Sequence, residues 1–179
     1  MRPPDHFETE RLVARVPEPG DAPAVFSAYA SDPEVTTYLS WPAYTDVPAL
    51  ASFLAERSGE WQSADSHSFS WLVSLRDDPT PIGSIGVTFQ QTGALFGYVL
   101  ARRHWNRGLM SEVLSRLSGW ALSQPRIYRA WAFCHVGNSA SARVMEKAGM
   151  SREGVLRRWQ RFPNLSPEPQ DCLVYARTR

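Results

Sequence analysis

The sequence is poor in the features that mark several classes of protein. It has two cysteines, Cys134 and Cys172, which lie far apart and follow no CxxC spacing, so neither a disulfide framework nor a zinc site is predicted. The formal net charge is only +1, which gives no basis for a nucleic-acid or anionic-membrane partner. No run approaches the ~18 apolar residues of a membrane span, and no apolar signal segment follows the N-terminus. We therefore expect a cytoplasmic protein with reduced thiols, no metal, no nucleic acid and no membrane partner.

Lysine is nearly absent, because Lys147 is the only lysine among 19 basic residues. Arginine binds phosphate through two parallel hydrogen bonds, which lysine does not form. A compositional bias of the genome produces the same count, and we favour that explanation. The arginine content alone therefore predicts no ligand.

The apolar content is sufficient for one domain. The 179 residues are 43% hydrophobic, which permits a continuous core without cross-links. Sequence patterns predict a single α/β (α+β) domain over residues 1–179. Strand patterns cover residues 10–16, 68–75, 82–89, 94–100, 127–136, 151–161 and 171–178. Longer helical patterns cover residues 21–31, 46–61, 110–123 and 139–149, and a short helix begins at Asp32-Pro33. The proline-bearing segments 77–81 and 162–170 are expected to be loops.

One stretch is expected to organise the rest of the chain. Arg102-Arg103-His104-Trp105-Asn106-Arg107-Gly108-Leu109-Met110 joins the strand at 94–100 to a helix. A turn with one glycine and three arginines directly before a helix presents unpaired backbone N–H groups and the positive end of the helix dipole. That combination binds a phosphate or pyrophosphate. The second glycine and the Lys-Ser/Thr pair of a Walker loop are absent, as is a GxGxxG fingerprint, so ATP and NAD are not predicted.

Within this stretch, Trp105-Asn106-Arg107-Gly108-Leu109-Met110 resembles the coenzyme A pyrophosphate loop of the GNAT acetyltransferase superfamily, Gln/Arg-x-x-Gly-x-Gly/Ala. It departs from that pattern at both outer positions, Trp105 and Met110. Further along, the segment from Asn138 to Met150 resembles the superfamily's Asn-x-x-Ala/Ser…Glu-Lys-x-Gly-Phe motif almost position for position. Glu8-Thr9-Glu10-Arg11-Leu12 is also similar to the opening of the RimJ/RimL branch, the N-terminal protein acetyltransferases.

The resemblance implies a GNAT fold, a mixed twisted sheet of six to seven strands with about four helices, splayed between central strands where acetyl-CoA enters. It implies acetyl-CoA as co-substrate and no metal. Backbone groups of Tyr98, Val99 and Leu100 are expected to pair with the pantetheine arm. The residues expected to hold the pyrophosphate are those of the loop: Arg103, Trp105, Asn106, Arg107, Gly108, Leu109 and Met110. The two arginines either reach phosphate or are simply solvated.

The resemblance also bears on the catalytic residues. Most of the superfamily uses a tyrosine seven residues after the helix-capping asparagine as the acid for the departing thiolate, and here that position is Met145. The RimJ/RimL branch often has a serine three residues after the asparagine, which this chain keeps as Ser141. We expect the Ser141 hydroxyl to bond the departing sulfur, the alternative being a bond to its own helix backbone. Asn138 is expected both to cap the helix and to contact pantetheine.

No general base is evident. His67, His135, Glu168 and Asp171 are candidates by position, but a lone histidine at a strand end is more often structural. Glu112 is expected to be structural, since a carboxylate is favourable in the first turn of a helix. The pKa of an α-amine is ~7.7–8.0 and that of lysine ~10.4, so a site without a strong base suits the α-amine better by roughly 3.4 kcal/mol.

We therefore predict acetyl-CoA-dependent N-acetylation of a primary amine, with a protein N-terminal α-amine as first choice. Two alternatives stay open: acetylation of a small-molecule amine such as an antibiotic or polyamine, and a non-catalytic acyl-CoA-binding sensor. An acidic groove would favour the cationic small molecules, and a wide open groove would favour a peptide. Tyr38, Trp41 and Tyr44 either line that groove or belong to the core. The protein is expected to be a monomer or a homodimer.

Overall fold

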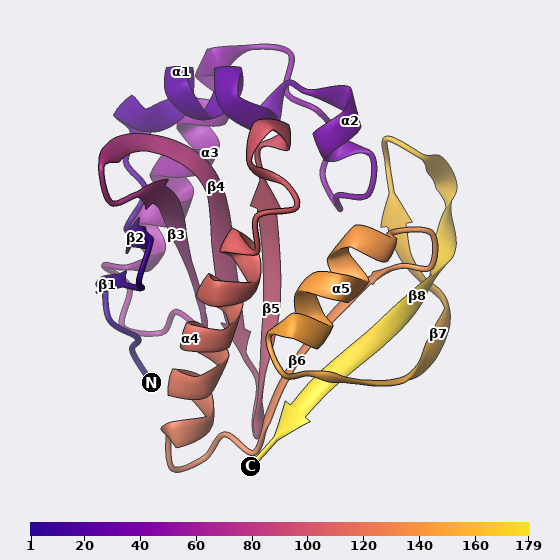
Figure 1. Cartoon of the computed structure of the whole chain (residues 1–179). Helices are drawn as coiled ribbons and strands as arrows, with labels where there is room; N and C mark the ends of the chain where they lie inside the picture. The colour runs from indigo at the N-terminus through magenta and orange to yellow at the C-terminus, as the bar shows by residue number, and fades with distance from the viewer.

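The computed structural model describes residues 1–179 and contains one open mixed sheet with helices on both faces (Figure 1). The strand order is β1-β2-β3-β4-β5-β6-β8-β7. The strands are β1 (His6–Glu8), β2 (Leu12–Arg15), β3 (Ser68–Leu75), β4 (Asp78–Phe89), β5 (Gly93–Leu100), β6 (Arg129–His135), β7 (Ser151–Phe162) and β8 (Ser166–Thr178). The helices are α1 (Ala22–Val25), which continues as a wide turn over Phe26–Ala30, α2 (Pro33–Thr36), α3 (Val47–Glu60), α4 (Leu109–Ser123) and α5 (Ser139–Lys147). None of them is both long and apolar enough to cross a membrane.

The α/β class is confirmed, but the sheet has eight strands rather than the six to seven expected. The additional strand is β1, which pairs with β2 through only three residues, from His6 opposite Arg15 to Glu8 opposite Val13. Three residues are too few to show the alternation by which a strand is recognised in a sequence. The number of strands was therefore underestimated at the N-terminus.

The prediction of a loop over residues 162–170 is wrong for most of that segment. Strand β8 begins at Ser166, and its register with β7 includes Gln170 opposite Gln160. Strand β6 pairs with β8 only from Cys172 onward. Pro167 and Pro169 therefore lie where one edge of β8 has no neighbouring strand, and proline is tolerated in a strand only at such an edge.

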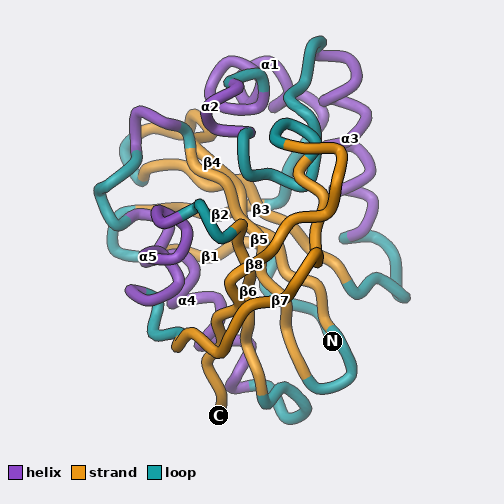
Figure 2. The backbone as a smooth tube through the Cα atoms, turned by 90° about the vertical axis from the view of Figure 1, so that its right-hand side faces the viewer, coloured by secondary structure: helices purple, strands orange, loops and turns teal.

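Two hydrophobic cores lie on opposite faces of the sheet. Figure 2 shows α4 and α5 on one side of the strands and α3 on the other. Because side chains alternate along a strand, Trp71 and Phe96 belong to the larger core beneath α4 and α5. Leu72 and Val99 belong to the smaller core beneath α1 and α3. The central strands thus present one face to each helix layer.

Strands β5 and β6 pair in parallel over a short length and then separate. The register comprises three pairs, Gly93 with Arg129, Ala94 with Ala130 and Leu95 with Trp131. Beyond them β5 runs on to Leu100 and β6 to His135 without pairing to each other. Figure 1 shows the two strands meeting near the C-terminus and diverging toward α2. The expected splay is confirmed, and half of the backbone groups beyond Leu95 face the opening.

Helices α2 and α3 each begin at an aspartate that caps them, whereas Asp21, before α1, makes no side-chain capping bond. The Asp32 carboxylate accepts a hydrogen bond from the backbone N–H of Glu34 at 2.8 Å and begins α2. The Asp46 carboxylate accepts one from Ala49 N–H at 2.8 Å and begins α3. Each carboxylate satisfies a donor that a helix start leaves unpaired. The two helices hold the segment between them over the sheet.

Candidate active site

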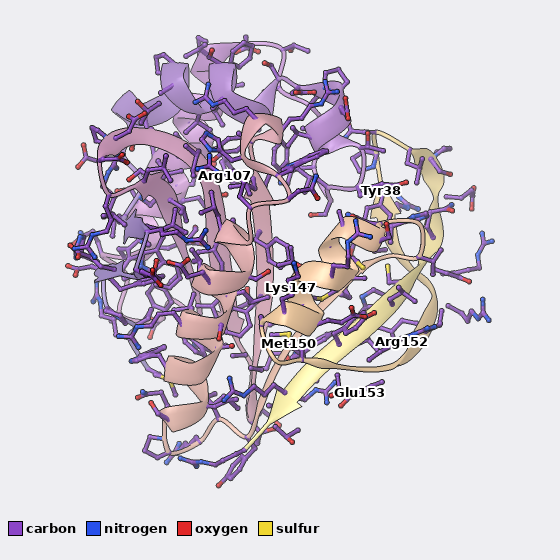
Figure 3. The ribbon with its side chains drawn as sticks, in the orientation of Figure 1. Tyr38, Arg107, Lys147, Met150, Arg152 and Glu153 are labelled. Atoms are coloured by element: carbon purple, nitrogen blue, oxygen red, sulfur yellow. The ribbon has the colours of Figure 1, made fainter.

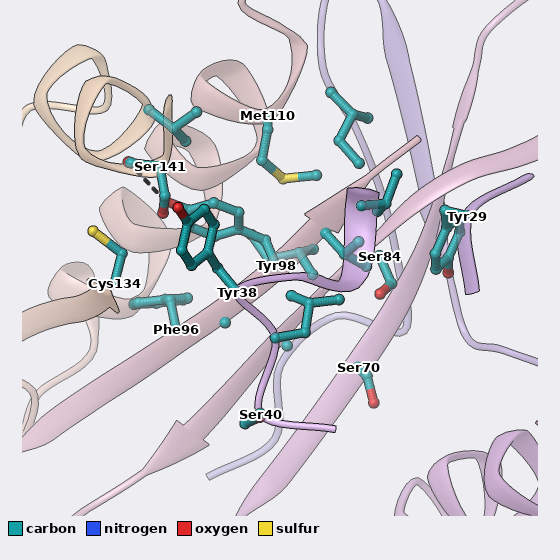
Figure 4. A pocket seen from close by; sticks show the side chains of 18 of the residues that line it. Tyr29, Tyr38, Ser40, Ser70, Ser84, Phe96, Tyr98, Met110, Cys134 and Ser141 are labelled. Carbon is teal, nitrogen blue, oxygen red and sulfur yellow. Dashed lines mark hydrogen bonds between the residues drawn. The ribbon is translucent and has the colours of Figure 1, made fainter. Parts of the chain in front are cut away.

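A cavity of about 930 Å³ runs through the opening between β5 and β6. At one end it is lined by Asn106 and the start of α4, at its middle by Tyr98 and the start of α5, and at the other end by residues 25–57 of the helices α1 to α3 and their connections. The size lies at the upper end of the range for small-molecule sites, ~300–1,000 Å³. Figure 4 shows several of the side chains that line it.

The start of α4 leaves its backbone donors open. Gly108 immediately precedes the helix with φ of 73°, a left-handed conformation that favours glycine. No side chain caps this end of the helix. The N–H groups of Leu109, Met110 and Ser111 therefore have no partner within the helix, and all three residues line the cavity. Such a helix start attracts an anion through its free donors and its dipole.

Arg11, at the start of β2, holds this helix start in place. The guanidinium of Arg11 donates to Glu112 at 2.7 Å and to the carbonyl of Arg107 at 3.0 Å, and the Arg11 backbone N–H donates to Glu112 at 2.9 Å. Burial acts to raise the pKa of Glu112, but hydrogen bonds from Thr9 and Arg11 outweigh it, so the pKa lies below its ordinary value. The structural role expected for Glu112 is confirmed by these bonds.

Arg103 and Arg107 lie behind the loop, not in the cavity lining. Arg103 Nε donates to His104 Nε2 at 3.0 Å, and Arg107 Nη1 lies 3.2 Å from His104 Nδ1. Burial, followed by the two neighbouring guanidinium groups, lowers the pKa of His104. Figure 3 shows Arg107, Tyr38 and Lys147 on three different elements around the opening. A phosphate contact by either arginine stays a prediction.

Trp105 and Met110, the two departures from the expected loop pattern, have structural contacts. The Trp105 indole N–H donates to the carbonyl of Leu100 at 2.7 Å and ties the loop to the end of β5. The Leu100 carbonyl is therefore already engaged within the protein. Met110 is buried in the larger core while its chain also borders the cavity. Both residues are thus tied to the helix start, whose unpaired donors are on the backbone.

The start of α5 is capped by its own side chain. Asn138 Oδ1 accepts a hydrogen bond from the Ser141 backbone N–H at 3.0 Å, which confirms the capping role of Asn138. The contact of Asn138 with pantetheine stays a prediction, although Asn138 lines the cavity.

Ser141 carries a hydroxyl whose bonding differs from that of an ordinary helix serine. Its Oγ lies 2.8 Å from the hydroxyl of Tyr98, and no bond to its own helix backbone is formed by that Oγ. The Tyr98 hydroxyl also lies 3.1 Å from the Ser141 carbonyl, to which it is able to donate. Burial raises the pKa of Tyr98, so the phenol stays protonated at neutral pH. Figure 4 shows both hydroxyls in the cavity, with Cys134 nearby on β6.

The role of the Tyr98 side chain was missed at the level of the sequence. Only its backbone was expected to matter, because the resemblance concerns the strand and not this side chain. Alternation along β5 places Tyr98 on the same face as Phe96, toward α4 and α5. That alternation was the available signal, but the contact with Ser141 depends on where α5 packs.

Met145, at the position of the superfamily's usual tyrosine, is fully buried in the larger core. It supplies no proton and does not line the cavity. Cys134 lines the cavity, but burial raises the pKa of its thiol to about 11. The thiol is therefore almost entirely protonated near neutral pH and is a poor nucleophile. The Ser141 and Tyr98 hydroxyls lie near it.

None of the four candidate bases lines the cavity, and three of them are engaged elsewhere. His135 Nδ1 accepts from the Gly137 backbone N–H at 3.0 Å, and its ring stacks on Tyr38 with centroids 5.0 Å apart. Glu168 pairs with Arg158 at 2.9 Å, and Asp171 accepts the backbone N–H of Arg158 at 2.8 Å. His67 does not line the cavity, nor do the other three. Glu34 is the one carboxylate residue in the lining, and it pairs with Arg102 at 3.0 Å.

The aromatic residues Tyr38, Trp41 and Tyr44 line the far end of the cavity. Trp41 and Tyr44 also pack against the smaller core, and their ring centroids lie 5.6 Å apart. Trp41 and Tyr44 therefore both contact a core and line the cavity. They form a wall between core and cavity. Whether that cavity is the acceptor groove stays a prediction.

The structure thus combines an eight-stranded α/β sheet splayed at its centre with an open helix start beside the splay. The model of the acetyltransferase (GNAT) domain matches residues 11–151. The chain is 30% identical to YoaA of Bacillus subtilis (strain 168), named as an N-acetyltransferase, over 95% of this chain and 94% of that protein. The chain therefore belongs to the GNAT acetyltransferase family.

Two solved structures share the fold at lower identity. The microcin C7 self-immunity acetyltransferase MccE, in complex with acetyl-CoA and AMP, has a TM-score of 0.85 and 16% identity over 99% of this chain and 98% of that chain. RimL, the ribosomal L7/L12 α-N-protein acetyltransferase in complex with coenzyme A, has a TM-score of 0.80 and 20% identity over 95% of each chain. Fold neighbours thus include acetyltransferases solved with acetyl-CoA or coenzyme A.

Proposed function

We propose that this acetyltransferase transfers the acetyl group of acetyl-CoA to a primary α-amine, with a protein N-terminus as the preferred acceptor. The observation that carries the proposal is the uncapped start of α4 at one end of a cavity that also contains the Ser141 and Tyr98 hydroxyls. The backbone donors of Gly108, Leu109 and Met110 would hold the diphosphate. Unpaired backbone groups of β5 would hold the pantetheine arm in the opening.

Ser141 is the proposed acid. If Tyr98 donates its hydroxyl proton to Ser141 Oγ, at 2.8 Å, the Ser141 hydroxyl proton is free to point into the cavity. As the amine nitrogen bonds to the acetyl carbon and the carbon–sulfur bond breaks, Ser141 would donate a hydrogen bond to the departing sulfur. The nitrogen would lose its second proton to water, and the thiolate would leave as coenzyme A and take up a proton from water. A positioned donor of this kind stabilises developing charge without reorganisation.

The absence of a free carboxylate in the cavity supports an α-amine as acceptor. Glu34 is paired with Arg102, and no other aspartate or glutamate is in the lining. An amine must then lose its proton to water before it attacks, which is about 3.4 kcal/mol harder for lysine than for an α-amine. The name of RimL, a fold neighbour, describes α-N-protein acetylation, which agrees with this choice.

The same charge distribution argues against a polycationic acceptor such as a polyamine. Besides Glu34, the charged residues in the lining are basic: Arg57, Arg143 and Lys147. A substrate with several ammonium groups would meet like charges in a partly dehydrated site, which costs several kcal/mol. A neutral small-molecule amine stays the second candidate.

The test is coenzyme A release over a panel of N-terminal peptides, lysine peptides with blocked N-termini and polyamines. We expect release with α-amines, and we expect kcat/KM to rise with pH toward the amine pKa of ~7.7–8.0. Thermal stabilisation by acetyl-CoA with no release from any acceptor would instead identify a sensor. Equal rates with blocked lysine peptides would refute the choice of α-amine.

A further inference from the structure

Three small residues on adjacent strands form the floor of the cavity on the side of α1 to α3. Ser70 of β3 lies opposite Gly86 of β4, and Gly86 lies opposite Gly97 of β5. All three line the cavity. Glycine in the middle of a strand weakens the strand, and its presence in a central sheet marks a site where another group approaches the backbone closely.

Gly86 and Gly97 are flanked on both sides by residues with larger side chains, and Ser70 has the larger Leu72 on one side and Ser68, of equal size, on the other. The row toward α4 contains Leu72, Ser84 and Val99 in register, and the other row contains Ser68, Thr88 and Leu95. All six line the cavity. Rows on the same face are separated by about 7 Å along the strands. Ser70, Gly86 and Gly97 are therefore the bottom of a trough that crosses the strands, and we refer to these three residues as the glycine trough.

The space above Gly97 is open. A Cβ atom placed on Gly97 would meet no atom within 4 Å, and Gly97 is exposed although it lies within β5. At Gly86 the same atom would make ordinary contacts at 3.5 Å or more. The fold itself therefore does not require glycine at position 97, since packing would accept a side chain there. The open space above Gly97 is therefore available to a ligand.

The opposite wall of the trough is aromatic. Tyr38, Trp41 and Tyr44 line the same cavity, and Phe53 continues the wall with its ring centroid 6.2 Å from that of Tyr44. Figure 4 shows Tyr38, Ser40, Ser70 and Ser84 among the residues that line the same cavity. A flat backbone floor opposite aromatic rings matches the shape of an aromatic ring, which gains energy from stacking beyond its area burial.

The trough offers little net charge to a ligand. Glu34 is paired with Arg102. Arg57, at the far end of the lining, pairs with Glu60 at 3.0 Å and lies over the Phe53 ring at 5.2 Å from its centroid. An uncharged flat group finds no unpaired ion here.

We propose that the glycine trough binds a flat aromatic group of the acceptor, a few bonds from the amine that is acetylated. The proposal rests on the proposed function and adds the class of acceptor. Two sources share this chemistry: the first residue of a peptide that begins with an aromatic amino acid, and an arylalkylamine. Gly97 faces α1 to α3 and the Tyr98 side chain faces α4 and α5, so the amine of a ring seated in the trough would have to pass through the opening between β5 and β6 to reach the Ser141 hydroxyl.

The experiment compares kcat/KM for four acceptors: a peptide beginning with phenylalanine, the same peptide beginning with alanine, phenethylamine, and spermidine. We expect the phenylalanine peptide to exceed the alanine peptide at least about tenfold, because burial of an aromatic ring is worth more than 1.4 kcal/mol. Phenethylamine reaching the rate of the phenylalanine peptide identifies an arylalkylamine as the source, and a rate far below it identifies a peptide. Spermidine is expected to be poor.

A substitution then tests the trough itself. In Gly97→Val, the side chain fills the floor, so kcat/KM should fall about tenfold for the phenylalanine peptide and change little for the alanine peptide. The matched control is Gly154→Val, at a β7 glycine where a Cβ atom would equally meet nothing within 4 Å and which does not line the cavity. Trp41→Leu tests the aromatic wall and should also reduce the preference for the phenylalanine peptide. This variant replaces Gly97→Val as the test if Gly97→Val does not fold.

The outcomes separate this inference from the proposed function. Equal kcat/KM for the two peptides, or an aromatic preference unchanged in both Gly97→Val and Trp41→Leu, would overturn the glycine trough as the acceptor site while leaving the transferase activity intact. No coenzyme A release with any acceptor would overturn the proposed function. A preference that disappears in Gly97→Val and persists in Gly154→Val would support the inference.

Discussion

Helices α4 and α5 both begin at a turn that follows a strand of the central sheet, but they treat their first backbone N–H groups differently. Helix α4 begins after Gly108 with no side-chain cap. Helix α5 begins at Asn138, whose side chain accepts the N–H of Ser141. The first arrangement leaves donors for an anion from outside the protein. The second satisfies a donor internally and fixes the position of Ser141.

This difference divides the work of the site between its two helix starts. The open start of α4 is suited to bind the charged end of a coenzyme, because its backbone donors have no hydrogen-bond partner within the helix. The closed start of α5 is suited to hold a reacting hydroxyl in one orientation, since capping and the contact with Tyr98 restrict it. Substitutions at each helix start separate the two roles.

The largest effect is expected from Gly108→Asp. This substitution places an acidic residue immediately before α4, at the position that the capping Asn138 occupies before α5. The added carboxylate would lie beside the diphosphate, and like charges at such a distance should weaken acetyl-CoA binding on the order of a thousandfold. Calorimetric titration measures the change. The uncharged control is Gly108→Asn, which keeps the shape and tolerates the left-handed backbone. Equal losses in both variants would show that charge at this helix start does not matter.

Ser141→Ala tests the closed start. Removal of a donor to developing charge typically costs about a hundredfold in kcat, while binding of acetyl-CoA should hardly change, because the diphosphate contacts lie on α4. Stopped-flow or steady-state coenzyme A release gives kcat. An undiminished kcat in a normally folded Ser141→Ala protein would end the role of Ser141 as acid.

Tyr98→Phe removes only the hydroxyl that orients Ser141. We expect kcat to fall about tenfold, in keeping with the loss of one hydrogen bond worth roughly 1–1.5 kcal/mol, with KM for acetyl-CoA unchanged. If Tyr98 acts through Ser141, the combined Ser141→Ala/Tyr98→Phe protein should be no slower than Ser141→Ala alone. Multiplicative losses in that double mutant would show that the two hydroxyls act independently.

The smallest effect is expected from Glu112→Gln, which loosens the attachment of the α4 start to Arg11. The pKa of Glu112 lies below its ordinary value in the folded protein, so its contribution is present above the unfolded pKa of ~4.3 and is lost as pH falls through the folded value. At pH 7 the free energy of unfolding should drop by about 1 kcal/mol, since Arg11 is partly exposed and its pairing is screened. Urea unfolding of both proteins should show the difference closing below about pH 4. A difference that persists at low pH would contradict an ionic role.

Both helix starts are features that the sequence predicts. The start of α4 was predicted from residues 102–110 because an anion site made of backbone groups depends on local conformation, and Gly108 directly before a helical pattern specifies it. The cap at Asn138 was predicted for the same reason. Each involves neighbours in the chain, which local patterns describe well.

The features that the sequence did not reveal depend on contacts between distant segments. The Tyr98–Ser141 contact joins β5 to α5 across 43 positions of the chain. The trough combines Ser70, Gly86 and Gly97 from three strands, and only their register makes it visible. The local pattern predicts a loop at Pro167 and Pro169, since the free edge of β8 that tolerates them is a property of the sheet. In each case the local sequence pattern does not predict the feature, because it depends on how distant segments pack.

The most direct measurement is the structure of this protein with coenzyme A bound. We expect the diphosphate to lie about 3 Å from the backbone N–H groups of Gly108, Leu109 and Met110, with the pantetheine arm between β5 and β6. A diphosphate bound at the start of α5, or anywhere away from the start of α4, would contradict the division between the open and the closed helix start.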